Sequence, residues 1–533
     1  MFKIKRYLKP YIALLLGAVM LLFGQAMLEL TLPNYMSDIV NVGLQQGGIT
    51  YSAPKAIDAQ SMQMIQMFMS EEDKTAAQGA YTQLEASDLA ELQKTYPNLQ
   101  AGDYAMLGES SEQVESAFSR ASYAMVLTIK QMADKQGGDS SGSAKETSID
   151  PQVMEQMMMA LRQPAMQEQI QSAISEAAVT PETMISQTGP VLVKSFYRAL
   201  GADTDAIQTN YILMDGLKML GLTVLLTSCA IAAGFCLSRL GAGVGRDLRR
   251  DVFSKVTNFN NSEMDQFSTA SLITRSTNDI TQIQNFLSMG FRMMCFAPIM
   301  GLGGLIMGIS KSISLAWIMA LALIVMLGLI STLFSIALPR FKKMQSLVDR
   351  LNLVSREELS GIMVIRAFAN QDFVQKRFDG ANRDLTSNTL FVNRAMATMM
   401  PVMTFVMNGI SLLIVWFGGK QIEQSTLQVG DMMAFIQYAM HVIMSFLFIS
   451  IMFIMVPRAS VSAERINEIL TTENKVADPK QPKHFAKRPS GLVEFKDVSF
   501  RYDGADADVL EHITFTAQPG QTTAFIGSTG SGK

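Results

Sequence analysis

The chain has 533 residues, 48% of them hydrophobic, and its mean hydropathy is positive. This composition excludes an ordinary soluble enzyme and indicates a membrane protein, while a formal net charge of −3 gives no basis for nucleic-acid binding. The three cysteines, Cys229, Cys236 and Cys295, all lie in apolar runs, which predicts small buried hydrophobes rather than a disulfide framework.

The chain begins with ten residues, 1–10, in which basic and apolar side chains alternate, a pattern typical of a short amphipathic lead-in on a membrane surface. The apolar run that follows, from about 11 to 32, is long enough to span a bilayer and too long for a cleaved signal peptide. Five more runs of spanning length follow at 211–238, 286–309, 313–338, 396–418 and 432–456. The expected fold class is therefore mainly α, a polytopic membrane protein with six helices over 11–470.

Lysine and arginine set the expected orientation. They gather in the N-terminal lead-in, after the second run and after the fourth. If six helices alternate, all three regions fall on one side, which the positive-inside rule makes cytoplasmic. Both termini are then cytoplasmic, in a multi-pass protein of the cell membrane. The two long cytoplasmic connections keep helical spacing, so we expect these helices to continue past the bilayer.

Residues 45–205 separate the first two spans and are expected outside the cell. They are polar, with few strand-like runs, and predict a small α-helical domain. The expected helices lie near 55–70, 85–96, 111–135, 151–175 and 181–199. Methionines cluster at 62–69 and 154–159, and thioethers suit Cu(I). Apolar residues interleave with them, so we expect a methionine-rich core and no metal site.

Four polar residues interrupt the apolar spans: Arg292, Asn408, Gln437 and His441. Polar groups are costly within a bilayer and usually face a cavity. Hydrogen bonding between helices, without substrate contact, is an equally good interpretation. Glu29 is expected nearer the outer boundary.

The tail contains a polar linker, 471–490, and then alternating runs at 492–495 and 498–500 that predict antiparallel strands. A β-branched, apolar run at 522–526 predicts a buried strand. It leads into a G-x-x-x-x-G-K phosphate-binding loop formed by Gly527, Ser528, Thr529, Gly530, Ser531, Gly532 and Lys533. Backbone N–H groups of such a loop surround a phosphate and its lysine reaches the β- and γ-phosphates. Tyr502 offers a flat face for adenine.

The expected cofactors are ATP and Mg²⁺. The metal-ligating hydroxyl would follow Lys533, so residues 491–533 are interpreted as the start of a nucleotide-binding domain cut within its active site. We expect no complete catalytic set and no ATP hydrolysis by the 533-residue chain itself. A glycine-serine turn without function is disfavoured, because the strand, the spacing and the lysine agree.

Several stretches carry a family resemblance: 267–268 with 272–279, 356–361 with 364–368, 463–466, and 495–502. In this order the chain resembles an ABC exporter half-transporter of multidrug type, with a large insert between helices 1 and 2. The resemblance implies a second half, in a homo- or heterodimer, and ATP held between the two nucleotide domains. It also implies two coupling helices, although plain helix–helix turns are the alternative. Their candidate residues are Ser262, Asp265, Phe267, Ala369 and Asp372.

The leading functional hypothesis is ATP-driven export of hydrophobic or amphipathic compounds by alternating access. The expected partners are a second half-transporter, the lipid bilayer and a small hydrophobic substrate, with no nucleic acid. A peptide or lipid exporter of the same architecture remains open. So does a ligand-sensing membrane protein that uses its extracellular domain.

Overall fold

The computed structural model describes residues 5–85, 89–106, 108, 110–135, 164–180, 185–424, 426–473, 481, 490–501 and 506–528. The chain forms two compact units. The larger consists of Leu16–Phe235 with Arg292–Phe453, and the smaller of Met1–Leu15, Cys236–Phe291 and Ile454–Lys533.

In the described part of the chain, six helical segments are long and apolar enough to cross a membrane, as predicted. The first comprises α1 (Lys5–Leu8), η2 (Lys9–Tyr11), α2 (Ile12–Asp38) and η3 (Ile39–Gln45), and the second is α11 (Thr204–Thr257). The third comprises α13 (Thr269–Thr274), η4 (Arg275–Asp279), α14 (Ile280–Asn285), η5 (Phe286–Gly290) and α15 (Phe291–Lys311). The fourth comprises η6 (Ile313–Leu315) and α16 (Ala316–Ser360), the fifth is α18 (Gln371–Glu423) and the sixth is α19 (Val429–Thr471). Two short helices, α12 (Asn261–Gln266) and α17 (Ile362–Ala367), lie in the long connections.

The spanning helices extend beyond the thickness of a bilayer. Helices α11, α16 and α18 have 54, 45 and 53 residues. At about 1.5 Å per residue, each is more than twice as long as a hydrocarbon core of about 30 Å. Large apolar side chains remain exposed along them, among them Leu220, Phe235, Ile324 and Phe405. Lipid covers such surfaces in a membrane, so the chain is a multi-pass membrane protein.

Small residues bring α15 close to its neighbours. A Cβ atom on Gly301 would lie 2.6 Å from the Ser445 hydroxyl of α19, and one on Gly304 would lie 3.2 Å from the Tyr438 carbonyl oxygen. Without a hydrophobic driving force in lipid, close backbone approach of this kind supplies much of the packing between membrane helices. Helices α15 and α19 therefore pack as a tight pair.

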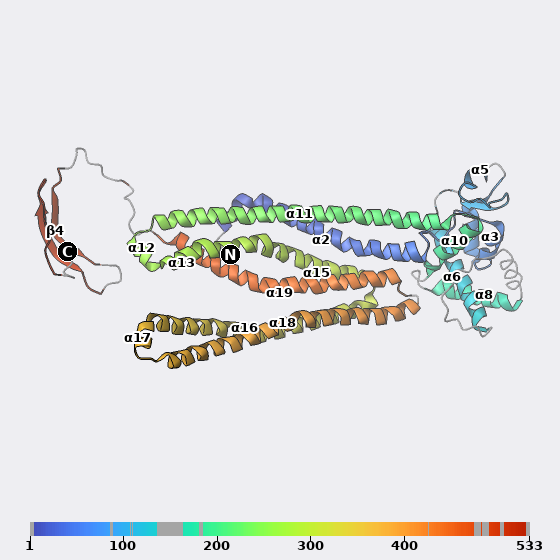
Figure 1. Cartoon of the computed structure of the whole chain (residues 1–533). Coiled ribbons are helices and arrows are strands. Elements are labelled where there is room, and N and C mark those ends of the chain that lie inside the picture. The colour runs from blue at the N-terminus through green and yellow to red at the C-terminus, as the bar shows by residue number, and fades with distance from the viewer. Residues whose placement is uncertain are drawn as a thin grey trace. The chain divides into compact units, whose positions relative to one another are not determined.

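Helices α16 and α18 form a second pair, joined by α17 and lying side by side along their length (Figure 1). Asn388 donates to the Arg340 carbonyl oxygen at 3.1 Å, and Arg350 pairs with Asp384 at 3.0 Å. At the end of this pair next to the loop that joins α18 to α19, apolar side chains form a buried core. This core includes Leu315, Ile414, Phe435 and Val442.

Residues 45–205 form an inserted domain between α2 and α11 (Figure 1). Its helices are α3 (Ala59–Gln66), α4 (Glu71–Ala80), α5 (Leu89–Leu92), α6 (Glu112–Lys135), α8 (Pro164–Val179) and α10 (Thr188–Ala199). Helix α6 packs against α3, α4, α8 and α10. The predicted helices at 55–70 and 85–96 are shorter than expected, α4 was not predicted, and residues 151–163 lie outside the described residues.

The inserted domain also contains a small sheet that the sequence did not predict. Strands β1 (Ala56–Ile57), β2 (Tyr81–Gln83) and β3 (Tyr104–Met106) are antiparallel in the order β1-β3-β2. Strands of two or three residues are too short to show alternation, which explains why the pattern pointed to helices alone.

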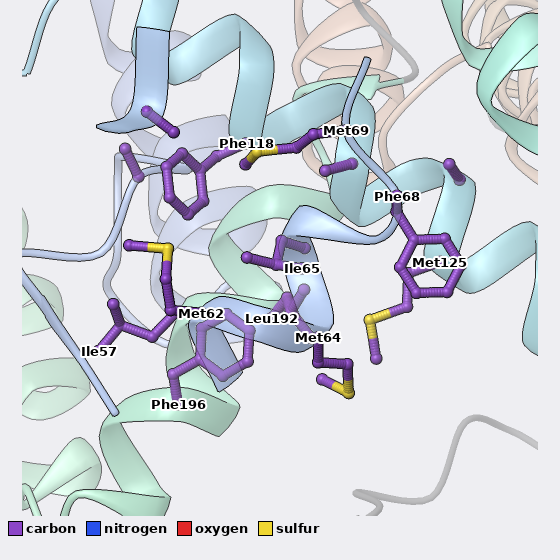
Figure 2. Close-up of a cluster of buried hydrophobic side chains, with 14 of the residues drawn as sticks. Ile57, Met62, Met64, Ile65, Phe68, Met69, Phe118, Met125, Leu192 and Phe196 are labelled. Atoms are coloured by element: carbon purple, nitrogen blue, oxygen red, sulfur yellow. The ribbon is translucent and has the colours of Figure 1, made fainter. Parts of the chain in front are cut away.

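Methionines fill the core of the inserted domain. Met62, Met64, Met69 and Met125 are at most 2% exposed and pack among Phe68, Phe118 and Phe196 (Figure 2). An unbranched thioether fills irregular gaps well. For the methionines at 62–69 the structure therefore supports the interpretation as core packing. Residues 154–159 lie outside the described residues.

Glycines fix the base of the inserted domain. A Cβ atom on Gly43 of η3 would lie 2.9 Å from the Ile212 side chain of α11. Gly48 has φ +79°, and its Cβ would lie 2.9 Å from the Gln208 Cα atom. Only glycine allows the backbone to approach so closely in this conformation.

In the smaller unit, the tail forms a two-stranded antiparallel ribbon. Strands β4 (Val493–Phe500) and β5 (Leu510–Ala517) pair with two register shifts. The rings of Phe495 and Phe515 stack with centroids 4.6 Å apart. The predicted runs at 492–495 and 498–500 thus form a single strand.

The predicted strand at 522–526 is wrong for this structure. These residues have no regular structure and are exposed, Ile526 to 95%. A strand needs a hydrogen-bonded neighbour, and in the described part of the tail β4 and β5 pair only with each other.

Candidate functional site

A polar cluster links α2 and α15 within the spans. The Arg292 guanidinium donates to the side-chain amide oxygen of Gln25 at 3.5 Å. Gln25 is only 6% exposed, and its side chain also lies close to the Glu29 carboxylate one turn along α2. Arg292 and Glu29 are both half-buried. The structure thus brings together one predicted residue and two that sequence analysis did not assign.

Glu29 was expected nearer the outer boundary, and this stays a prediction. Helix α2 continues to Asp38 and η3 to Gln45, so the helical segment itself extends beyond Glu29.

The other three predicted cavity residues do not join this cluster. Asn408 on α18 and Gln437 on α19 are exposed. His441 on α19 is half-buried, and its Cβ lies 3.6 Å from the position that a Cβ on Gly304 would occupy. This contact places His441 where α15 packs against α19.

A second polar network joins α2, α15 and α19 at their insert-side ends, next to the inserted domain. Asp431 accepts a hydrogen bond from Ser37 at 2.8 Å and pairs with Lys311 at 2.7 Å. Asn41 donates to the Ser37 hydroxyl at 3.1 Å and accepts from the Gly430 N–H at 2.7 Å. One carboxylate thus holds three spans together.

The first coupling candidate is a well-defined short helix. Glu263 of α12 accepts from the Asn260 N–H at 2.9 Å, while the Asn260 side chain accepts from the Glu263 N–H at 3.2 Å. This reciprocal capping fixes the start of the helix. Ser262 and Asp265 lie on α12, and their side chains lie outside the described residues. Phe267, immediately after it, is 4% exposed.

Phe267 connects this turn to the end of α19. Its ring stacks on Phe259, with centroids 6.0 Å apart, and carries the Arg275 guanidinium 5.0 Å from its centroid. Arg275 in turn pairs with Glu468 at 2.7 Å and donates to the Arg465 carbonyl oxygen at 3.0 Å. This places the turn after α12 in contact with the segment that leads into the tail.

The second coupling candidate surrounds the end of α17. Ala369 has φ +49°, a left-handed conformation uncommon for alanine, and it reverses the chain between α17 and α18. Ala369 and Asp372 are both exposed, and Asp372 lies in the first turn of α18. Nearby, Arg377 pairs with Glu357 at 2.6 Å across the two long helices. Both candidate segments therefore form turns between long helices, and their coupling role stays a prediction.

The predicted phosphate-binding loop is described only at its entry. Gly527 is half-buried and Ser528 exposed, whereas Tyr502 and the residues Thr529, Gly530, Ser531, Gly532 and Lys533 lie outside the described residues. Phe525, two residues before the loop, packs edge-on against Phe515 of β5 with centroids 4.9 Å apart. The strand ribbon thus anchors the entry to the loop.

Comparison with known proteins identifies this arrangement. A family model described as the ABC transporter transmembrane region matches residues 175–446, just over half of the chain. The chain belongs to the ABC transporter family. The six spans agree with the membrane region of an ABC transporter.

Relatives of this ABC transporter carry the same family name. An uncharacterised ABC transporter ATP-binding protein of Mycobacterium tuberculosis is 40% identical over 318 residues, which is 60% of this chain and 55% of that protein. A Bacillus subtilis protein of the same description is 33% identical over 318 residues, with the same shares. An ATP-dependent lipid A-core flippase of Aromatoleum aromaticum is 25% identical over 354 residues, 64% of this chain and 57% of the flippase. The chain spans a little over half the length of these curated relatives.

Most of the inserted domain of this ABC transporter precedes the family match, which begins at residue 175 within α8.

A cavity of about 1010 Å³ opens between α4, α6 and α8, with Phe68, Asp73, Glu112, Arg120 and Ile174 among its lining residues. Arg120 pairs with the buried Asp73 and donates to the Ser116 hydroxyl. The cavity therefore combines an apolar wall with an ion pair.

Proposed function

We propose that the chain is half of an ATP-driven exporter of hydrophobic or amphipathic compounds in the cytoplasmic membrane. Two halves, identical or different, enclose a membrane cavity and expose it alternately to the two sides. The observation that carries the proposal is the order of parts in one chain. An ABC membrane domain is followed, after the linker 471–490, by a strand ribbon and a G-x-x-x-x-G-K loop.

The proposed ATP site uses Tyr502 to stack on adenine and residues 527–533 to hold the phosphates. Lys533 would neutralise charge on the β- and γ-phosphates, and a bound Mg²⁺ would supply further positive charge to the same phosphates. The β4–β5 ribbon supports this assignment because Phe515 holds Phe525 at the entry to the loop.

The proposed coupling elements are the turns at 262–267 and 369–372. Support comes from the continuous contacts Phe267–Arg275–Glu468, since closure of the nucleotide domains has to reach the spans through rigid, connected elements. The proposed orientation places these turns in the cytoplasm and the inserted domain outside the cell, from the lysine and arginine distribution.

Transport into inverted vesicles tests the proposal. Vesicles containing the assembled transporter should accumulate a lipophilic dye when ATP is added and lose this uptake when Lys533 is replaced by alanine. Vesicles with the K533A variant control for dye partition into lipid. Absence of ATP-dependent uptake for every amphipathic dye, with homodimer and heterodimer partners alike, would contradict export of such compounds.

A second candidate is ligand sensing by the inserted domain, and its cavity favours this function. The cavity volume is within the range of small-molecule sites. If an external ligand changed ATP turnover in the wild type but not after deletion of 50–203, sensing would gain over export of that ligand. Peptide or lipid export remains an alternative cargo class, and a flippase is among the relatives.

A further inference from the structure

Arg292 and Glu29 are ionisable groups within spanning helices, where an isolated charge is costly and usually serves a function. They do not form a direct ion pair in the described structure. Gln25 lies between them: its side-chain oxygen accepts from Arg292 at 3.5 Å, and its side chain lies close to the Glu29 carboxylate. A structural pair would place its charges in contact, because charge-assisted hydrogen bonds are short.

Both charged groups retain unused hydrogen-bonding capacity. A guanidinium has five N–H donors and a carboxylate has about four lone-pair sites. Among the described residues, Arg292 makes this one long side-chain hydrogen bond, and Gln25 is the side chain that lies beside the Glu29 carboxylate. Each side chain is half-buried rather than enclosed, so a ligand can reach it.

Apolar surface lies directly beside the charges. Ala26, Leu30, Met300, Ala434 and Tyr438 form a buried cluster between α2, α15 and α19, with Met27 and Phe296 partly buried against it. Phe296 lies one turn along α15 from Arg292 and, like Met27, is only partly buried. An amphipathic molecule can therefore pack its apolar body against these partly exposed side chains while its polar head meets the charges.

We propose that Gln25, Glu29 and Arg292 form a subsite for the zwitterionic head of an amphiphile. Arg292 binds its carboxylate or phosphate, Glu29 binds its ammonium group, and Gln25 holds the two protein charges apart. The inference rests on the proposed function, since it assigns the exporter a class of substrate. Amino-acid or peptide termini and ethanolamine lipid heads share this chemistry.

Binding without ATP tests the subsite separately from export. The probe is ε-dansyl-lysine, whose α-ammonium and α-carboxylate form a zwitterionic head on a fluorescent, amphipathic body. Its C-terminal amide is a cation, its N-acetyl derivative an anion, and the doubly blocked form is neutral. Affinities are measured by fluorescence on the purified chain in nanodiscs at pH 6, where an α-amine is protonated. Empty nanodiscs give the lipid background.

We expect the zwitterion to bind about tenfold more tightly than either singly charged form, as a charge-assisted hydrogen bond at each end predicts. Arg292→Gln should abolish the advantage of the zwitterion over the amide, and Glu29→Gln its advantage over the N-acetyl form. Arg292→Lys should restore part of the first advantage. Thr31→Val is the matched control, because that hydroxyl bonds to its own helix at the Leu28 carbonyl oxygen.

If the triad had only a structural role, replacing its residues would not change the preference for the zwitterionic head group. Equal affinity for zwitterionic and neutral probes in the wild type would overturn the inference, as would equal losses in all variants including Thr31→Val. Displacement by dihexanoyl phosphatidylethanolamine alone would assign the head to lipids, and displacement by a free dipeptide alone to peptides. Charge-selective binding without export would contradict the proposed function but not this inference. Export without charge selectivity would contradict this inference but not the proposed function.

Discussion

Replacing Asp431 by alanine should weaken the packing of three spans at once. Its carboxylate pairs with Lys311 at 2.7 Å and accepts from Ser37 at 2.8 Å, which ties α19 to α15 and to α2. Both charged side chains are 23% exposed. The pair is thus more enclosed than a surface ion pair but not fully buried.

The expected cost follows from this intermediate burial. Surface pairs contribute about 0–1 kcal/mol and breaking a buried pair costs about 3–5 kcal/mol, so we expect about 2 kcal/mol for leaving Lys311 alone. Loss of the Ser37 hydrogen bond adds about 1 kcal/mol. Asp431→Ala should therefore lower the free energy of unfolding by about 3 kcal/mol.

The assay is denaturation of the purified chain in mixed micelles, carried through a double-mutant cycle with Lys311→Met. We expect a coupling energy of about 1–2 kcal/mol between the two positions. Ser310→Ala is the control, because that hydroxyl bonds to the Met307 carbonyl oxygen of its own helix. A coupling energy near zero, or equal losses for Asp431→Ala and the control, would refute the reasoning.

Three further predictions concern the inserted domain, the nucleotide site and the topology. Tyr197→Phe removes the acceptor of the Lys55 N–H at 2.8 Å and should cost about 1–3 kcal/mol in thermal unfolding of the chain. Because burial raises the pKa of Tyr197, the wild type should also lose stability as the pH rises above about 10, and the variant less so. In the assembled transporter, Tyr502→Ala should weaken ATP binding by about 1–3 kcal/mol, measured by nucleotide titration, and unchanged affinity would exclude adenine stacking. An impermeant thiol reagent should label Ser175→Cys but not Ser346→Cys on intact cells relative to the parent chain, and the reverse pattern would overturn the orientation.

The spans were predictable because their signal is local. A run of about 20 apolar residues is visible in the sequence whatever its neighbours are, and all six runs form helices. The capping of α12 is equally local, since Asn260 and Glu263 are three residues apart. Helix α4 was missed although Ser70 caps it by accepting from the Asp73 N–H, a spacing that would have found it.

The contacts of the candidate site were not predictable for the opposite reason. Arg292 stood out as a charge in an apolar run, but its partner Gln25 lies 267 positions away. Ser37 and Asp431 are separated by 394 positions. Nothing in either segment alone marks the other as its neighbour. The strands at 56–57, 81–83 and 104–106 depend on pairing in the same way.

The close approach at the base of the inserted domain has a mechanical consequence. Gly43 and Gly48 press η3 and the chain after it against α11 at Ile212 and Gln208, with no room for a side chain between them. The two connections to the inserted domain, η3 and α11, therefore move together as one rigid unit. They can twist or tilt together, but they cannot separate. Any torque that the inserted domain experiences reaches the spans through α2 and α11 together. Helix α2 also carries Ser37 of the three-span network and Glu29 of the polar cluster. A movement of the inserted domain therefore reaches both groups of residues through this one helix.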